Sequence, residues 1–158
     1  MRSLVALADV GGAQRTETSV TIGELLTERL EMTQPWYRFL STARSSRRWL
    51  DRVNSVLGEG RVIVRPGSTL VELPQLERAV ALASVALAER TPIVMLDQLD
   101  SFGSDEEESA FVAAVARLAP ATTTLVIGTP VPSRCDSVAD RHLVSVDLYS
   151  LSTEGLVR

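Results

Sequence analysis

The stretch that decides the fold runs from Arg90 to Glu108 and reads RTPIVMLDQLDSFGSDEEE. Its apolar run from Ile93 to Leu96 predicts a buried strand that ends at Asp97. Ser104 is followed three positions later by Glu107, the capping-box pattern that begins a helix. Beyond that helix, TTTLVIG at 122–128 predicts a second strand, of the kind covered on both faces. Strand, helix and strand over 92–128 form a βαβ unit, whose two strands run parallel.

The segments before this unit alternate between strand-like and helical patterns. An apolar strand is expected at 4–8, and Thr21 with Glu24 forms a second capping box that opens a mainly helical region at 21–58. RVIVRPGSTLVEL at 61–73 is β-branched and broken by Pro66 and Gly67, which indicates a strand-like connection. From Pro74, placed in a first turn, an amphipathic helix presents an apolar stripe made of Leu76, Val80, Ala83 and Leu87. HLVSVDLYS, at 142–150, predicts a final strand.

These elements predict the α/β class with a mostly parallel sheet and a helical insertion. The α/β core comprises residues 1–20 and 59–158, and the helical subdomain inserted in it comprises residues 21–58. At 158 residues the chain has the length of one ordinary domain. A single core is therefore expected.

Composition excludes several classes of function. The net charge of −4 gives no electrostatic basis for binding nucleic acid. No apolar run reaches the ~18 residues of a membrane span, and the N-terminus lacks the pattern of a signal peptide, so we expect a cytoplasmic protein. A single cysteine, Cys135, and a single histidine, His142, cannot form a clustered Cys/His metal site. The basic residues are all arginine, and the chain contains no lysine.

The candidate site lies where the strands of the βαβ unit end. In open parallel sheets, ligands bind beyond the carboxyl ends of the strands. Asp97 and Gln98 lie at one such end, and Gly128 to Pro130 lie at the next. A carboxylate held by a buried strand suits magnesium beside nucleotide phosphates. The alternative is that Asp97 only forms the turn into the next loop, a common role for aspartate.

The order of segments resembles the ATP-binding cassette (ABC) ATPases. LPQLERAVALASVALAERTPIVMLDQLDSF is similar to the family's run from the signature motif, through the following helix, to the Walker B strand. SLVALADVGG with TETSVTIGELLTERL resembles the Q-loop strand and the helix that opens the family's helical subdomain. TTTLVIGTP and VADRHLVSVDL look like the H-loop strand and the strand after it. The resemblance implies a P-loop NTPase-like core, incomplete at its N-terminus.

Carried over residue by residue, the resemblance implies a degenerate site. Asp97 takes the Walker B position that holds magnesium, and Gln98 takes the position of the catalytic glutamate. An amide at that position can orient water but cannot accept its proton. Asp9 falls near the Q-loop glutamine and Thr129 at the H-loop histidine. Glu72, Leu73, Pro74 and Gln75 fall near the signature motif, where a glutamate would repel phosphate and the larger side chains would fill the space.

The largest departure is the P-loop, which needs a Gly-rich turn and a lysine that this chain does not have. The chain resembles the later two-thirds of a cassette domain. Either it is a fragment of a longer subunit or it is a naturally shortened, non-catalytic relative. We expect ATP and Mg²⁺ to bind the complete subunit, and neither to bind this chain tightly.

The resemblance leads to two hypotheses about function. The first is part of the ATP-binding subunit of an ABC-type transporter that does not hydrolyse ATP as it stands. The second is a non-catalytic, ABC-like module that docks a membrane or protein partner. Expected partners are a membrane-spanning transporter subunit, at the inner face of the membrane, and other copies of this chain, recruited by an unpaired sheet edge. Nucleic acid is not an expected partner.

Two surface features allow alternative interpretations. Trp36, Tyr37 and Phe39 either line the groove that receives the membrane subunit or fill the core of the helical subdomain. Arg44, Arg47, Arg48 and Arg52 either form a solvated helix face or meet anionic lipid or an acidic partner. Asp105 to Glu108 are explained as the first turn of a helix, where carboxylates suit the helix dipole, and a metal site is not needed to account for them.

Overall fold

The computed structural model describes residues 5–9, 20–33, 42–97 and 102–128, with positions 138 and 144; for residues 7–9, 33, 42, 43 and 97 it describes the backbone alone. The elements follow in the order β1 (Val5–Asp9), α1 (Ile22–Thr33), α2 (Thr42–Leu57), η2 (a 3₁₀ helix, Leu70–Glu72), α3 (Gln75–Ala88), β2 (Ile93–Asp97), α4 (Asp105–Leu118) and β3 (Thr124–Ile127). The α/β class is therefore confirmed. Trp36, Tyr37, Phe39 and the strand expected at 142–150 lie outside the described residues.

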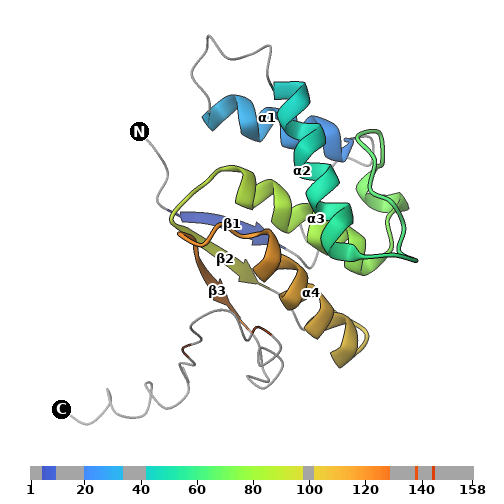
Figure 1. Ribbon diagram of the computed structural model, residues 1–158, viewed down its shortest axis with the longest axis vertical. Helices are drawn as coiled ribbons and strands as arrows, with labels where there is room; N and C mark the ends of the chain where they lie inside the picture. The colour runs from blue at the N-terminus through green and yellow to red at the C-terminus, as the bar shows by residue number, and fades with distance from the viewer. Residues whose placement is uncertain are drawn as a thin grey trace, which may run out of the picture.

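The three described strands form one parallel sheet in the order β1-β2-β3. Val94 of β2 is in register with Ala6 of β1 and with Leu125 of β3. The βαβ unit expected over 92–128 is thus confirmed. Because all strands point the same way and the order in the sheet follows the chain, two right-handed crossovers place α3 and α4 on the same face. Figure 1 shows both helices on one side of the sheet.

The face of the sheet away from α3 and α4 is partly open. Val5 is 43%, Met95 42% and Val126 42% exposed, whereas Ala6, Val94 and Leu96 are buried. The interpretation of 122–128 as a strand covered on both faces was therefore wrong for the described residues. The run is β-branched, but helices cover one face only, since both crossovers pass on the same side.

Helix α3 is the centre of the fold. The predicted stripe of Leu76, Val80, Ala83 and Leu87 is buried, but so is almost every other residue of this helix. It contacts β1 and β2 on one side and α1, α2 and α4 on the others. The expected amphipathic helix is thus enclosed nearly all round, because its alanines, together with Ser84, allow neighbouring elements to approach from several directions. Pro74 precedes the helix as its N-cap, one position earlier than expected.

Helices α1 and α2 account for the region expected to be helical at 21–58, and both pack on α3. Ile22, Leu26, Leu50 and Val53 belong to the same hydrophobic cluster as the residues of α3. Arg29 of α1 forms an ion pair with Glu89, the C-cap of α3, at 3.0 Å. The division into a core and a helical subdomain stays a prediction.

Arg52 does not share the environment of the other arginines of α2. Its Nη2 donates to the carbonyl oxygen of Leu118, at the end of α4, over 3.1 Å, and its guanidinium lies 5.1 Å from the centre of the Trp49 ring. It therefore links α2 to one of the last carbonyls of α4, which have no partner inside the helix. Arg44, Arg47 and Arg48 are exposed, as expected for a solvated helix face.

Both predicted helix starts are present. The Ser104 hydroxyl accepts a hydrogen bond from the Glu107 amide at 3.2 Å and caps α4. At α1 the Glu24 amide donates to the Thr21 hydroxyl at 3.3 Å, and the Thr21 amide donates to a Glu24 carboxylate oxygen at 2.8 Å. The Thr21 backbone amide, and then its hydroxyl, hold the pKa of Glu24 below its ordinary value of 4.5.

The Glu24 cap predicts a pH dependence of stability. Because folding lowers the pKa of Glu24, the cap contributes its stability above the pKa of the unfolded chain and loses it as pH falls through the folded pKa. We therefore expect Glu24→Gln to lower Tm near neutral pH and to converge with the wild type in acid. Thermal melts followed by circular dichroism across this range measure the difference. Glu28→Gln, exposed on the same helix, is the control and should run parallel to the wild type.

Alanine is predicted to destabilise the protein at position 23. Its amide donates to the Pro66 carbonyl at 2.9 Å, and a Cβ added at this position would lie 2.6 Å from that same oxygen. We expect Gly23→Ala to lower the free energy of unfolding by about 1–2 kcal/mol, since overpacking outweighs the gain in helix propensity. Urea unfolding measures the change, with Gly67→Ala, whose Cβ meets open space, as the control. Equal stability of the two variants would contradict the close approach.

Candidate functional site

The candidate site begins at the carboxyl end of the sheet. β1 ends at Asp9 and β2 ends at Asp97, and the Cα atoms of these two residues are partners in the parallel ladder. The Gly128 amide, just past β3, donates to the Leu96 carbonyl at 3.1 Å. The structure therefore brings the ends of all three described strands together at the backbone level. This confirms the adjacency expected for 97 and 128, and it adds Asp9 as the direct neighbour of Asp97.

Two of the predicted site residues lie outside the described residues. These are Gln98, at the position of the catalytic glutamate, and Thr129, at the H-loop position. For Asp9 and Asp97 the structure describes the backbone position alone. The roles assigned to these four side chains stay predictions.

The predicted signature region is described in full and does not form a phosphate cradle. Glu72 ends η2, and its carboxylate accepts a hydrogen bond from the Thr69 amide at 3.2 Å. Leu73 is only 6% exposed and belongs to the hydrophobic core. Pro74 has no amide hydrogen to offer at the start of α3, and Gln75 is its half-buried first residue. Glu72 therefore serves the local turn, and Leu73 packs inward.

The end of the molecule that carries the strand ends is acidic. In a parallel βαβ arrangement the helices begin where the strands finish, and Figure 1 shows α3 and α4 starting on that side. The first turn of α3 contains Glu77, and the first turn of α4 contains Asp105 to Glu108. Glu77 and Glu108 are buried, and Glu77 bonds to the Val62 amide, whereas Asp105 and Glu106 are exposed.

Glu77 is a buried acid that sequence reasoning missed. It is 2% exposed, and its Oε1 accepts a hydrogen bond from the Val62 amide at 3.2 Å. Its Oε2 is buried without a hydrogen-bond partner. No local pattern marked it, because a glutamate in the first turn of a helix is already explained by the helix dipole. The side chain holds the 61–65 segment against α3.

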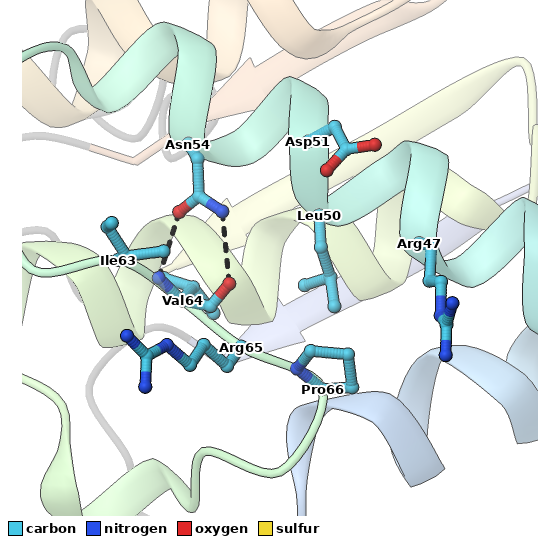
Figure 2. A pocket seen from close by; sticks show the side chains of 8 residues that line it. All are labelled: Arg47, Leu50, Asp51, Asn54, Ile63, Val64, Arg65 and Pro66. Atoms are coloured by element: carbon cyan, nitrogen blue, oxygen red, sulfur yellow. Dashed lines mark hydrogen bonds between the residues drawn. The ribbon is translucent and has the colours of Figure 1, made fainter.

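A hollow surface lies between α2 and the segment that follows it. It has a volume of ≈ 380 Å³, and Figure 2 shows Arg47, Leu50 and Asn54 of α2 facing Val64 to Pro66. The Asn54 side chain accepts from the Val64 amide at 2.8 Å and donates to the Val64 carbonyl at 3.0 Å. Both polar backbone groups of Val64 therefore point toward one side chain, as they would point toward a neighbouring strand.

Two kinds of feature are absent from the described residues. Within these ranges no group of three or more His, Cys, Asp or Glu side chains could hold a metal ion. None of the described helices is long and apolar enough to cross a bilayer. The first statement does not cover the Asp9 and Asp97 carboxylates, because only the backbone of these residues is described.

Comparison with known proteins identifies no family for this chain. Neither a scan against protein-family models nor a search of curated proteins finds a match. The resemblance to ABC ATPases therefore rests on the order of the sequence motifs.

Asn54 is predicted to hold the 61–65 segment in place. We expect Asn54→Ala to lower the free energy of unfolding by about 1–3 kcal/mol, because both backbone groups of Val64 lose their partner. Urea unfolding followed by circular dichroism measures this loss. Ser55→Ala, at the neighbouring exposed position of α2, is the matched control and should change stability by less than about 0.5 kcal/mol. A loss of stability of the same size in both variants would show that the substitutions weaken helix α2 itself, and not the two hydrogen bonds between Asn54 and Val64.

Proposed function

We propose that this chain is part of the ATP-binding subunit of an ABC-type transporter and does not hydrolyse ATP as it stands. One observation carries the proposal: β1 and β2 end in aspartates that are partners in the ladder, with the end of β3 beside them. In the resembled family these three strands, in this order along the chain, lead to the Q-loop, the Walker B aspartate and the H-loop. An aspartate pair at adjacent strand ends suits Mg²⁺, which takes one or two carboxylates and keeps several waters.

The residues present fit the metal better than they fit the phosphates. Asp97, with Asp9 beside it, would hold Mg²⁺ through water. At the signature position, Glu72 is bonded to Thr69, Leu73 is buried and Pro74 has no amide hydrogen, so the small residues that let a helix start approach a phosphate group are missing. The chain also lacks the lysine that reaches the β and γ phosphate oxygens. The nucleotide would therefore need residues supplied from outside this sequence, and Gln98 would orient water poorly.

The same observations support a second candidate function, a non-catalytic module that keeps the scaffold to dock a partner. The use of Glu72 in a local turn and the burial of Leu73 favour it, because they remove the contact through which such domains grip nucleotide across a dimer. The two candidates differ in whether Asp97 binds a metal ion.

Paramagnetic broadening by Mn²⁺ tests the first candidate. Mn²⁺ takes oxygen ligands as Mg²⁺ does and broadens nearby amide signals in ¹H–¹⁵N spectra. With ATP present, we expect broadening to begin at the strand ends, at Ala8, Asp9, Leu96 and Gly128. Asp97→Asn should raise the Mn²⁺ concentration required about tenfold, which corresponds to about 1.4 kcal/mol.

The control is Glu106→Gln, which removes an exposed carboxylate from the first turn of α4 and leaves the strand ends intact. It should not change the broadening at the strand ends. Broadening centred on residues 105–108, or insensitive to Asp97→Asn, would exclude the metal role and leave the docking module. Phosphate release above the buffer rate would show instead that the chain hydrolyses ATP unaided.

A further inference from the structure

A group of exposed arginines has no part in the ATP-binding proposal. Arg47 and Arg65 line the hollow of Figure 2. Arg61 lines a second hollow, of ≈ 410 Å³, which adjoins the first because Asn54 and Ile63 line both. Two further exposed arginines lie on α2 within one turn of residues that line the first hollow. We call the surface that these side chains form the basic face; its arginines are Arg44, Arg47, Arg48, Arg61 and Arg65.

The basic face concentrates positive charge in a chain that is acidic. Residues 42–66 contain six arginines and two acidic residues, a net charge of +4, whereas the net charge of the whole chain is −4. The acidic residues, Asp51 and Glu59, each line one of the hollows. The five arginines of the basic face form no ion pair with any of the described residues, and the sixth, Arg52, is engaged at the end of α4. An anionic partner is therefore favoured at this face.

Exposed apolar side chains lie among these arginines. Ile63 is 60% and Val62 48% exposed, and both lie between Arg61 and Arg65 in the chain. Pro66, which lines the first hollow, is exposed as well. Proteins that bind the surface of a bilayer combine these two kinds of side chain, because apolar groups enter the boundary between headgroups and acyl chains while cations meet the headgroup phosphates.

The segment that carries these apolar side chains is fixed in place. Asn54 of α2 bonds to both backbone groups of Val64. Arg65 closes a turn with Ser68, because its amide donates to the Ser68 hydroxyl at 3.1 Å and its carbonyl accepts from the Ser68 amide at 3.0 Å. The exposed side chains between these two points are therefore held in position before a partner arrives, and binding requires little ordering of the backbone.

The positions of the arginines favour an extended anionic surface over a single anion. Figure 2 shows Arg47 and Arg65 at opposite ends of the hollow, so their guanidinium groups do not converge on one phosphate or carboxylate. A bilayer with anionic lipid offers phosphates across a plane, and each arginine near that plane adds to the attraction. Nucleic acid would use the arginines but would leave Val62 and Ile63 in water. An extended peptide would need a free backbone edge, and Asn54 occupies the edge that faces α2.

We propose that the basic face binds the surface of membranes that contain anionic lipid. The five arginines contact headgroup phosphates, and the side chains of Val62 and Ile63 enter the boundary between headgroups and acyl chains. The protein lies on the bilayer through this face. The inference depends on neither candidate for the strand-end site, because it concerns a different surface.

Flotation of the full chain with lipid vesicles tests the proposal. We expect binding to phosphatidylcholine vesicles that contain about 30% phosphatidylglycerol, no binding to phosphatidylcholine alone, and release when salt rises from about 50 to about 500 mM. Arg47→Glu combined with Arg65→Glu should weaken binding at least about tenfold. The matched control, Arg90→Glu combined with Arg117→Glu, changes net charge equally at exposed residues that line neither hollow, and it should bind as the wild type does.

An apolar substitution distinguishes membrane binding from simple charge attraction. Ile63→Ser should weaken vesicle binding at least about threefold and leave any binding to soluble polyglutamate unchanged, because only the membrane receives an apolar side chain. Met32→Ser is the control, since Met32 is 68% exposed and lines neither hollow, and it should bind vesicles as the wild type does.

Four outcomes would overturn the proposal. These are equal binding to vesicles with and without phosphatidylglycerol, an equal loss of binding in either control variant, unchanged vesicle binding by Ile63→Ser, and binding to polyglutamate or nucleic acid without binding to vesicles. All substituted positions are exposed, so each variant should melt as the wild type does in circular dichroism.

Discussion

The fold depends on the burial of α3. This helix lies between the sheet and three other helices, and its residues from Leu76 to Ala88 are almost all enclosed. Each fully buried leucine or valine contributes about 1.5–3 kcal/mol relative to exposure. The alanines contribute less by their own burial, but their small size allows β1, α1, α2 and α4 to come close. Both the sheet and the α1–α2 pair pack on this helix.

The helix starts carry acidic side chains. Helix N-termini stabilise carboxylates, and Asp105, Glu106 and Glu77 occupy the first turns of α4 and α3. These carboxylates contribute to the stability of the fold. The proposed function assigns the metal, and not the phosphates, to residues of this chain because β1 and β2 end in aspartates that are partners in the ladder.

The opposite charge gathers around α2 and the 61–65 segment. That segment is outside any sheet, yet its inner edge is satisfied by two side chains, Asn54 from α2 and Glu77 from α3. At its other end, Arg65 closes a turn with Ser68 through both of its backbone groups. Residues 42–66 carry a net charge of +4 in a chain whose net charge is −4. Basic residues therefore gather on the part of the chain that these side chains hold in place.

Sequence alone determined the features that depend on local spacing. Side chains three positions apart define the caps at Thr21 and Ser104. Apolar side chains three or four positions apart define the helix from Leu76 to Leu87, and one apolar run defines the strand that ends at Asp97. Hydrogen bonds and helix turns at this range are encoded by neighbouring residues. The adjacency of the strand ends at 97 and 128 also followed, because the two strands of a βαβ unit run parallel and so end at the same edge of the sheet.

Only the tertiary structure decided which surfaces are covered. It placed Asp9 in register with Asp97, and it enclosed α3 on almost every side while leaving one face of β3 open. It also bonded Glu72 to Thr69 and buried Leu73, so neither residue serves a phosphate site. Asn54 and Val64 are ten residues apart, and Glu77 and Val62 are fifteen apart. No local pattern records such pairs, since they form only when packing on α3 brings separate segments together. The physical reason is that hydrogen-bond partners and burial at this range are properties of the packed chain, whereas helix and strand periods are properties of a short stretch of sequence.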